Sequence, residues 1–138
     1  ALGIMATLNT LTVDYSKTRQ QFGSPIGSFQ VLQHRMVDTF MGCEQTKSML
    51  YRGLCESKSV EEGETDAQAL SKTVHALKAT VARYGKTIGE EAIQLHGGIG
   101  MTDELNIGHY VKRLMMINTT FGDGDFHQKK FNQLSYSV

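Results

Sequence analysis

Apolar side chains recur at every third or fourth position along most of the chain, the spacing of helices with one buried face. The longest such stripe spans some thirty residues in the second half of the sequence: Ala67, Leu70, Val74, Leu77, Val81, Tyr84, Ile88, Ala92 and Leu95. A second stripe runs from Phe29 to Leu54, and a shorter one from Leu2 to Tyr15. Strand-like alternation of apolar and polar positions is almost missing, so the pattern predicts an all-α protein.

Residues that end and begin helices divide the chain into five helical segments. Gly23 and Pro25 are expected to end the first segment, because proline disfavours helical geometry in the residue before it. Ser28 is a predicted cap for the second helix. Thr65 and Gln68 have the spacing of a capping box and are expected to start the third.

The second half of the chain contains a dense glycine turn. Gly97, Gly98 and Gly100 follow the third apolar stripe, and Thr102 or Asp103 is expected to cap a fourth helix. A short last helix is predicted from about Phe126 to Leu134. A stripe of some thirty residues is about 45 Å long and requires an equally long antiparallel neighbour. The expected architecture is an up-and-down four-helix bundle with long helices plus a short C-terminal helix.

The length of 138 residues suits one domain with a real core, so residues 1–138 are expected to form a single helical domain. The chain opens within an apolar stripe and without an initiator methionine. We therefore expect it to be a C-terminal fragment of a longer polypeptide.

Charge and cysteine content exclude several classes of partner. Lys plus Arg and Asp plus Glu are balanced at 14 each, so no overall field favours nucleic acid or an anionic membrane. No run of eighteen apolar residues or basic leader occurs, so no membrane span is predicted. Cys43 and Cys55 lie too far apart along one predicted helix for a disulfide. They are predicted to be buried thiols of a reducing compartment, the cytoplasm.

Three polar corners are candidates for chemistry. They are Arg19–Phe22 with Gln30, Gln94–Gly98, and Asp123–His127. The first two follow helices that point the same way, so they are expected to meet at one end of the bundle. A guanidinium, bare glycine backbone and an aromatic ring suit a ligand with phosphate and a base.

Each corner also has a purely structural explanation. Arg19 can serve the dipole of a helix C-terminus, and the glycines can form a cap between packed helices. His, Cys and carboxylates lack metal-ligand spacing, so no metal site is predicted. A nucleophilic serine is not predicted either, because no serine lies in a G-x-S-x-G segment.

The segments Arg19–Ile26, Phe29–Gln30 and Gln94–Glu104 together resemble the C-terminal helical domain of the acyl-CoA dehydrogenases. The R-x-x-F-G corner and the distant Q-x-x-G-G-x-G turn are specific in combination, and the similarity covers essentially the whole chain. The resemblance implies part of an FAD-dependent oxidoreductase that removes an α proton and a β hydride from an acyl-CoA thioester. The implied partners are the acyl-CoA substrate, further dehydrogenase subunits in a homo- or hetero-oligomer, and an electron-accepting protein.

The resemblance also assigns residues to the cofactor. It implies that Arg19 and Phe22 meet the pyrophosphate and adenosine part of FAD. Gln94, with the backbone of Gly97 and Gly98, would contact the same end of the cofactor. Gln30 is a neighbouring candidate. In the family this FAD belongs largely to the adjacent subunit, so these residues would also be dimer elements.

The sequence departs from the family at the catalytic base. The family places a glutamate in a Y-E-G-T-S-x-x-Q segment, whereas residues 121–128 read F-G-D-G-D-F-H-Q and contain no glutamate. Matching the acid-glycine pair puts Asp123 in its place, and an ungapped count puts Asp125 there. One alternative is a subunit without a base, a non-catalytic partner or assembly module of a two-chain dehydrogenase. Another is that both aspartates are ordinary turn residues.

Overall fold

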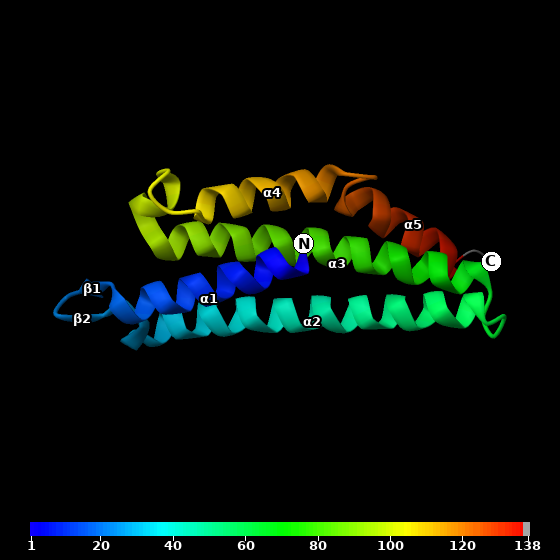
Figure 1. Ribbon diagram of the computed structural model, residues 1–138, viewed down its shortest axis with the longest axis horizontal. Coiled ribbons are helices and arrows are strands. Elements are labelled where there is room, and N and C mark those ends of the chain that lie inside the picture. The colour runs from blue at the N-terminus through cyan, green and yellow to red at the C-terminus, as the bar shows by residue number, and fades with distance from the viewer. Residues whose placement is uncertain (137–138) are drawn as a thin grey trace.

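The computed structural model describes residues 1–136, and these residues are mainly helical (Figure 1). Its elements are α1 (Leu2–Thr18), β1 (Gln20–Gln21), β2 (Ser24–Pro25), η1 (Ile26–Ser28), α2 (Gln30–Glu61), α3 (Ala67–His96), η2 (Gly97–Met101), α4 (Ile107–Thr119) and α5 (Gly124–Tyr136). The predicted all-α class is confirmed, and so is the bundle of long helices with a short last helix. No described helix is both long and apolar enough to cross a membrane.

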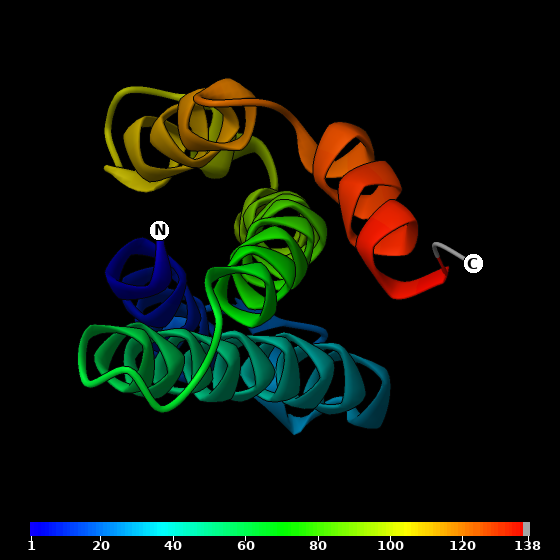
Figure 2. The same cartoon turned by 90° about the vertical axis from the view of Figure 1, so that its right-hand side faces the viewer.

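Helix α3 is the centre of the bundle and contacts α1, α2, α4 and α5. The helices run along one long axis, and successive helices from α1 to α4 alternate in direction (Figure 1). Seen end-on, α1 and α2 lie below α3, whereas α4 and α5 lie above and beside it (Figure 2). Helix α3 therefore fixes the position of every other helix.

The core forms where α1, α3 and α4 meet, and α2 adds one residue to it. Its buried members are Met5, Leu8, Cys43, Ile88, Ala92, Ile107, Val111 and Leu114. Glycines of α3 make this packing close: a Cβ on Gly85 would lie 3.2 Å from Met5 Cε, and one on Gly89 would lie 3.4 Å from Val111 Cγ1. These two glycines thus admit neighbouring helices of the same chain.

Helix α2 buries only part of the apolar stripe that the sequence predicts for it. Its buried residues are Thr39, Gly42, Cys43 and Thr46, whereas the stripe residues Phe40 and Leu54 are each 58% exposed. Tyr84 of α3 lies against Gly42 so closely that an added Cβ would meet its ring at 2.5 Å. Close approach thus selects small side chains on the contact face. Cys55 is exposed, so the prediction that it is a buried thiol was wrong, although Cys43 is buried.

Three predicted caps were wrong for local reasons. The Ser28 hydroxyl donates to the Pro25 carbonyl, and α2 starts two residues later. Asp66 caps α3 by accepting the Ala69 N–H at 2.7 Å, so the expected box at Thr65 is not used.

Helix α4 starts at Ile107, well after both of its predicted caps. The Thr102 hydroxyl instead donates to the Ile99 carbonyl, at the end of the short helix η2. Residues 97–101 form this short helix at the place where the sequence predicted a glycine turn.

Candidate functional site

A short β-hairpin with a two-residue turn presents Arg19 and Phe22 at one end of the bundle. Helix α1 ends at Thr18, earlier than predicted, and Arg19 is extended with φ −69° and ψ 124°. Strands β1 and β2 then pair around Phe22 and Gly23, whose φ values are 53° and 78°. Two central residues with positive φ match the twist of a tight hairpin. Phe22 is 93% exposed at its tip, with its ring edge-to-face against Phe29 at 6.2 Å.

The glycine turn at the end of α3 presents open backbone on one side. Gly97 has a φ of 64°, and its N–H already bonds to the carbonyls of Gln94 and Ile93. A Cβ added to Gly97 or to Gly98 would meet nothing within 4 Å. Another molecule can therefore approach this backbone closely, although the Gly97 N–H is taken by the helix end.

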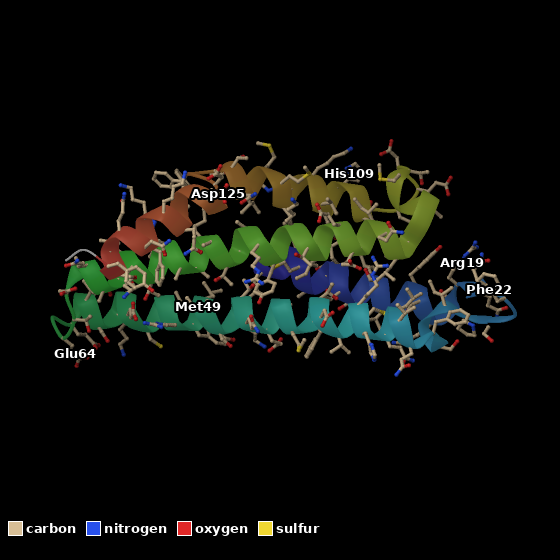
Figure 3. The ribbon with its side chains drawn as sticks, turned by 180° about the vertical axis from the view of Figure 1, so that it is seen from behind. Arg19, Phe22, Met49, Glu64, His109 and Asp125 are labelled. Carbon is tan, nitrogen blue, oxygen red and sulfur yellow. The ribbon has the colours of Figure 1, made fainter. Side chains whose placement is uncertain are left out.

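These two corners meet in one groove of about 460 Å³. Arg19 lines one side of the groove, and Gln94, Gly97 and Gly98 line the other. The arginine and glycine corners thus lie together at one end of the bundle, as the sequence predicts. Arg19 and Phe22 lie at this end, far from Glu64 at the opposite end (Figure 3). Phe22 and Gln30 are exposed beside the groove and are not among its lining residues.

Tyr15 and His96 also line the groove. His96 lies within the predicted Gln94–Gly98 corner, but neither residue was assigned a role from the sequence. Their rings stack with centroids 4.4 Å apart. His96 is buried, and its Nδ1 lies 2.7 Å from the Ala92 carbonyl. Because a carbonyl only accepts, Nδ1 carries the hydrogen, and a neutral His96 keeps Nε2 as an acceptor. The only available sequence signal was that His96 adjoins Gly97.

Asp123 caps helix α5, which starts at Gly124 and not at the predicted Phe126. Its Oδ1 accepts the Phe126 N–H at 2.8 Å, and its carbonyl accepts the His127 N–H at 3.1 Å. Asp125 follows in the first turn of the helix, and both aspartates are exposed. Asp123 therefore makes the contacts of an ordinary turn residue that caps a helix.

Both aspartates line a shallow depression between α3, α4 and α5, together with Arg83, Lys86 and Asn118. This depression is separate from the groove at Arg19. Asp125 and Arg19 lie far apart along the long axis of the bundle (Figure 3). The structure thus brings the first two polar corners together and leaves the third elsewhere.

Comparison with known proteins gives the family of this fold. The family model described as "Acyl-CoA dehydrogenase, C-terminal domain" matches residues 1–130. Acyl-CoA dehydrogenase IpdE2 of Mycolicibacterium smegmatis is 37% identical over 117 residues, which cover 81% of this chain and 32% of that protein.

Solved structures agree with this match. A variant of the Tcur3481–Tcur3483 steroid ACAD superposes with a TM-score of 0.89 at 26% identity, covering 99% of this chain and 36% of that one. The FAD complex of PigA gives 0.82 at 28% identity, covering 96% and 33%. The ChsE4–ChsE5 complex from Mycobacterium tuberculosis, at 21% identity and a TM-score of 0.86, shares the fold over 99% of this chain and 36% of that one.

The chain spans about a third of the length of the relatives that it matches. The match of the family model covers nearly all of the chain, and the arginine hairpin and the glycine turn both fall inside the matched region. This protein belongs to the acyl-CoA dehydrogenase family and carries its C-terminal domain.

Proposed function

We propose that this chain is the C-terminal part of an FAD-dependent acyl-CoA dehydrogenase and that its end groove holds the pyrophosphate and adenosine part of FAD. The supporting observation is that Arg19, Gln94, Gly97 and Gly98 line one groove. A relative with 37% identity is named an acyl-CoA dehydrogenase, and PigA at 28% identity is an FAD complex.

The chemistry of the lining residues fits a dinucleotide. The exposed Arg19 guanidinium is a fixed positive charge with several donors, which suits a pyrophosphate. The Gln94 amide adds a neutral donor, and the missing Cβ atoms at Gly97 and Gly98 allow a bulky ligand to reach the backbone. The exposed Phe22 ring offers a face to the adenine, with Gln30 as a further contact near the hairpin.

FAD, when bound, supplies the acceptor for the hydride that leaves the β carbon of an acyl-CoA thioester. This chain's own part in such a reaction would be to hold the cofactor and, with a neighbouring subunit, to form a dimer across it. An electron-accepting protein would then reoxidise the flavin. The remaining requirement is a base for the α proton, and Asp123 or Asp125 is the candidate in this chain.

A second candidate function is that of a non-catalytic partner subunit. The specific observation is that Asp123 already caps α5, so turning toward a substrate would cost the hydrogen bond to the Phe126 N–H. The fold neighbour ChsE4–ChsE5 is a complex of two named components, which is consistent with a two-chain assembly. Such a subunit would contribute cofactor contacts while its partner supplied the base.

The cofactor assignment is tested by titrating FAD into the apo form of the complete protein. A charge-assisted hydrogen bond contributes roughly 1.5–3 kcal/mol, so Arg19→Ala should weaken flavin binding about ten- to a hundredfold. Arg113→Ala removes the same charge from an exposed position on α4 and serves as the matched control. Equal affinities for the Arg19→Ala and Arg113→Ala variants would rule out the groove as the flavin site.

The two candidate functions are separated by flavin bleaching with a panel of acyl-CoA thioesters. Asp123→Asn keeps a good helix cap but removes the basic carboxylate, so it isolates proton abstraction from folding. Asp125→Asn is measured in parallel. A fall of two or more orders of magnitude in one variant, of the size that a general base supplies, identifies the base. Unchanged bleaching in both variants assigns this chain the non-catalytic part.

A further inference from the structure

Two histidines far apart in the sequence form a direct hydrogen bond on the side of α3 that faces α5. The Nδ1 atoms of His75 and His127 lie 2.8 Å apart, and the two rings are tilted with centroids 4.9 Å apart. His127 is buried, and its Nε2 lies 3.0 Å from the carbonyl oxygen of Phe121. His127 therefore links α3 to the turn between α4 and α5, which carries Asp123.

The positions of the protons follow from these partners. The Phe121 carbonyl only accepts, so His127 Nε2 carries a hydrogen. Nδ1 of a neutral His127 is then an acceptor, and His75 Nδ1 must donate to it. One added proton is tolerated, because it can occupy His75 Nε2 and leave the bond between the Nδ1 atoms intact. A second proton would place hydrogens on both Nδ1 atoms and two positive charges side by side.

We propose that His75 and His127 are positioning residues that together form a clamp, which holds residues 120–123 and the start of α5 against α3. The clamp is stable when the pair carries no added proton or one added proton, and it is unstable when the pair carries two. Protonation of both rings releases the turn that carries Asp123. The claim concerns the seating of this turn and goes beyond the proposed function, since it requires neither flavin nor acyl-CoA.

The surrounding charges oppose a second proton. Burial above all lowers the pKa of His75 below its ordinary value of 6.5, and the charges of His127 and of Lys130 on α5 add to this effect. On α3, Lys78 donates to the Ile117 carbonyl and interacts with Asp123 at the turn.

An uncharged ring also packs against the pair: Phe126 lies edge-on to both histidines. Helix α2 approaches another side of α3, and there Glu56 pairs with Arg52 of its own helix at 3.0 Å. The described residues contain no group of three or more His, Cys, Asp and Glu side chains that could hold a metal ion.

The direction of the pH effect follows from the second proton: only the doubly protonated pair loses its bond, so the clamp can fail only as the pH falls. The lowered pKa of His75 acts in the same direction. A histidine whose pKa is lower in the folded state stabilises the fold above its unfolded pKa, and this stabilisation is lost as the pH falls. The clamp should therefore hold at pH 7.5 and weaken toward pH 5.

Hydrogen exchange measured by mass spectrometry tests the clamp in the protein at pH 7.5 and pH 5.0, with intrinsic rates corrected for pH. The reporters are the amides of Gly122, Phe126 and His127, which are hydrogen-bonded within the turn and the start of α5. One lost hydrogen bond should speed their corrected exchange about three- to tenfold. We expect this increase in the wild type between pH 7.5 and pH 5.0.

Two substitutions and a control separate the clamp from general acid sensitivity. His75→Ala removes the donor and should give fast exchange at both pH values. His75→Gln should stay protected at both, because its amide donates to a neutral His127 and accepts from a protonated one. His109→Gln, at an exposed histidine of α4 (Figure 3), should follow the wild type.

Wild-type protection that does not change with pH, or a His75→Gln variant that loses protection at pH 5.0 as the wild type does, would refute the proposal. If His75→Ala fails to fold, the comparison of wild type with His75→Gln still decides. Flavin content is measured separately, so failure of the clamp and failure of the flavin assignment give different results.

Discussion

Gly124, the first residue of α5, lies so close to Ala82 of α3 that a side chain has no room there. A Cβ built on Gly124 would be 2.7 Å from the Cβ of Ala82. Both atoms are fixed to helical backbone, so rotation of a side chain cannot relieve the clash. Gly124→Ala must therefore push the start of α5 away from α3.

The cost can be estimated from this geometry. Overpacking of a well-packed contact costs about 1–3 kcal/mol, partly offset by the better helix propensity of alanine, roughly 0.5–1 kcal/mol. We expect Gly124→Ala to lower the free energy of unfolding by roughly 1–2 kcal/mol. An unfolding entropy of roughly 2.1 cal/mol/K per residue then implies a Tm decrease of about 3–7 °C for a chain of this size.

A double-mutant cycle with chemical denaturation is the appropriate assay. Ala82→Gly alone should cost about 1 kcal/mol, because glycine is a poor residue inside a helix. In the Gly124→Ala variant the same substitution should cost little or nothing, because the clash disappears, giving a favourable coupling of about 1 kcal/mol or more. Gly3→Ala in α1, where an added Cβ meets nothing within 4 Å, is the control and should stabilise slightly.

The reasoning is refuted if Gly124→Ala is as stable as the wild type. It is equally refuted if the effects of Gly124→Ala and Ala82→Gly simply add, because coupling is expected only when the two Cβ atoms compete for the same space.

Three further predictions concern a cap, the thiols and an ion pair. Asp123→Ala should cost about 1 kcal/mol in chemical denaturation through loss of the α5 cap, whereas Asp123→Asn should cost a few tenths at most. A thiol reagent should label the exposed Cys55 rapidly and the native protein's Cys43 slowly, because Cys43 is buried and its pKa is raised by that burial; equal rates, followed by mass spectrometry of peptides, would contradict this. Glu91→Gln should destabilise the protein by up to about 1 kcal/mol, because the Glu91 carboxylate lies 2.6 Å from Arg35 Nε between α3 and α2; a stability unchanged by the substitution would show that solvent screens the pair.

The helices were predictable because long amphipathic periodicity identifies them with little ambiguity. The stripe that ends at Leu95 lies on α3, which supplies the buried Ile88 and Ala92. The face of α2 was not predictable in the same way. There the close approach of Tyr84 to Gly42 selects small and hydroxylated residues for the contact, so the larger apolar residues lie outside it. The pattern of hydrophobic residues alone cannot reveal a helix contact whose main requirement is small side chains.

The parts of the candidate site that depend on residue types within or beside one turn could be predicted from the sequence. The parts that depend on tertiary contacts could not. Arg19 and the glycine turn could be paired in advance from helix directions in a bundle. The stack of Tyr15 on His96 and the hydrogen bond from His75 to His127 could not, since each joins residues separated by many turns of helix. The prediction of helix caps also failed where several polar residues lie near one helix start. The local path of the chain then decides which of these residues caps the helix.

The separation of the two polar sites limits how this chain can act. Ala82 lies under the start of α5, and Gly97 lies at the groove, fifteen positions farther along α3. At 1.5 Å per residue the two points are about 22 Å apart along one continuous helix. The groove and the aspartate turn therefore cannot both contact the same small group of atoms, and each must serve a different part of an extended ligand or a different subunit. Because the sites share no contact residues, substitutions at Arg19 and Gly124 should have additive effects on stability. Measurable coupling between them would mean that α3 transmits strain along its length.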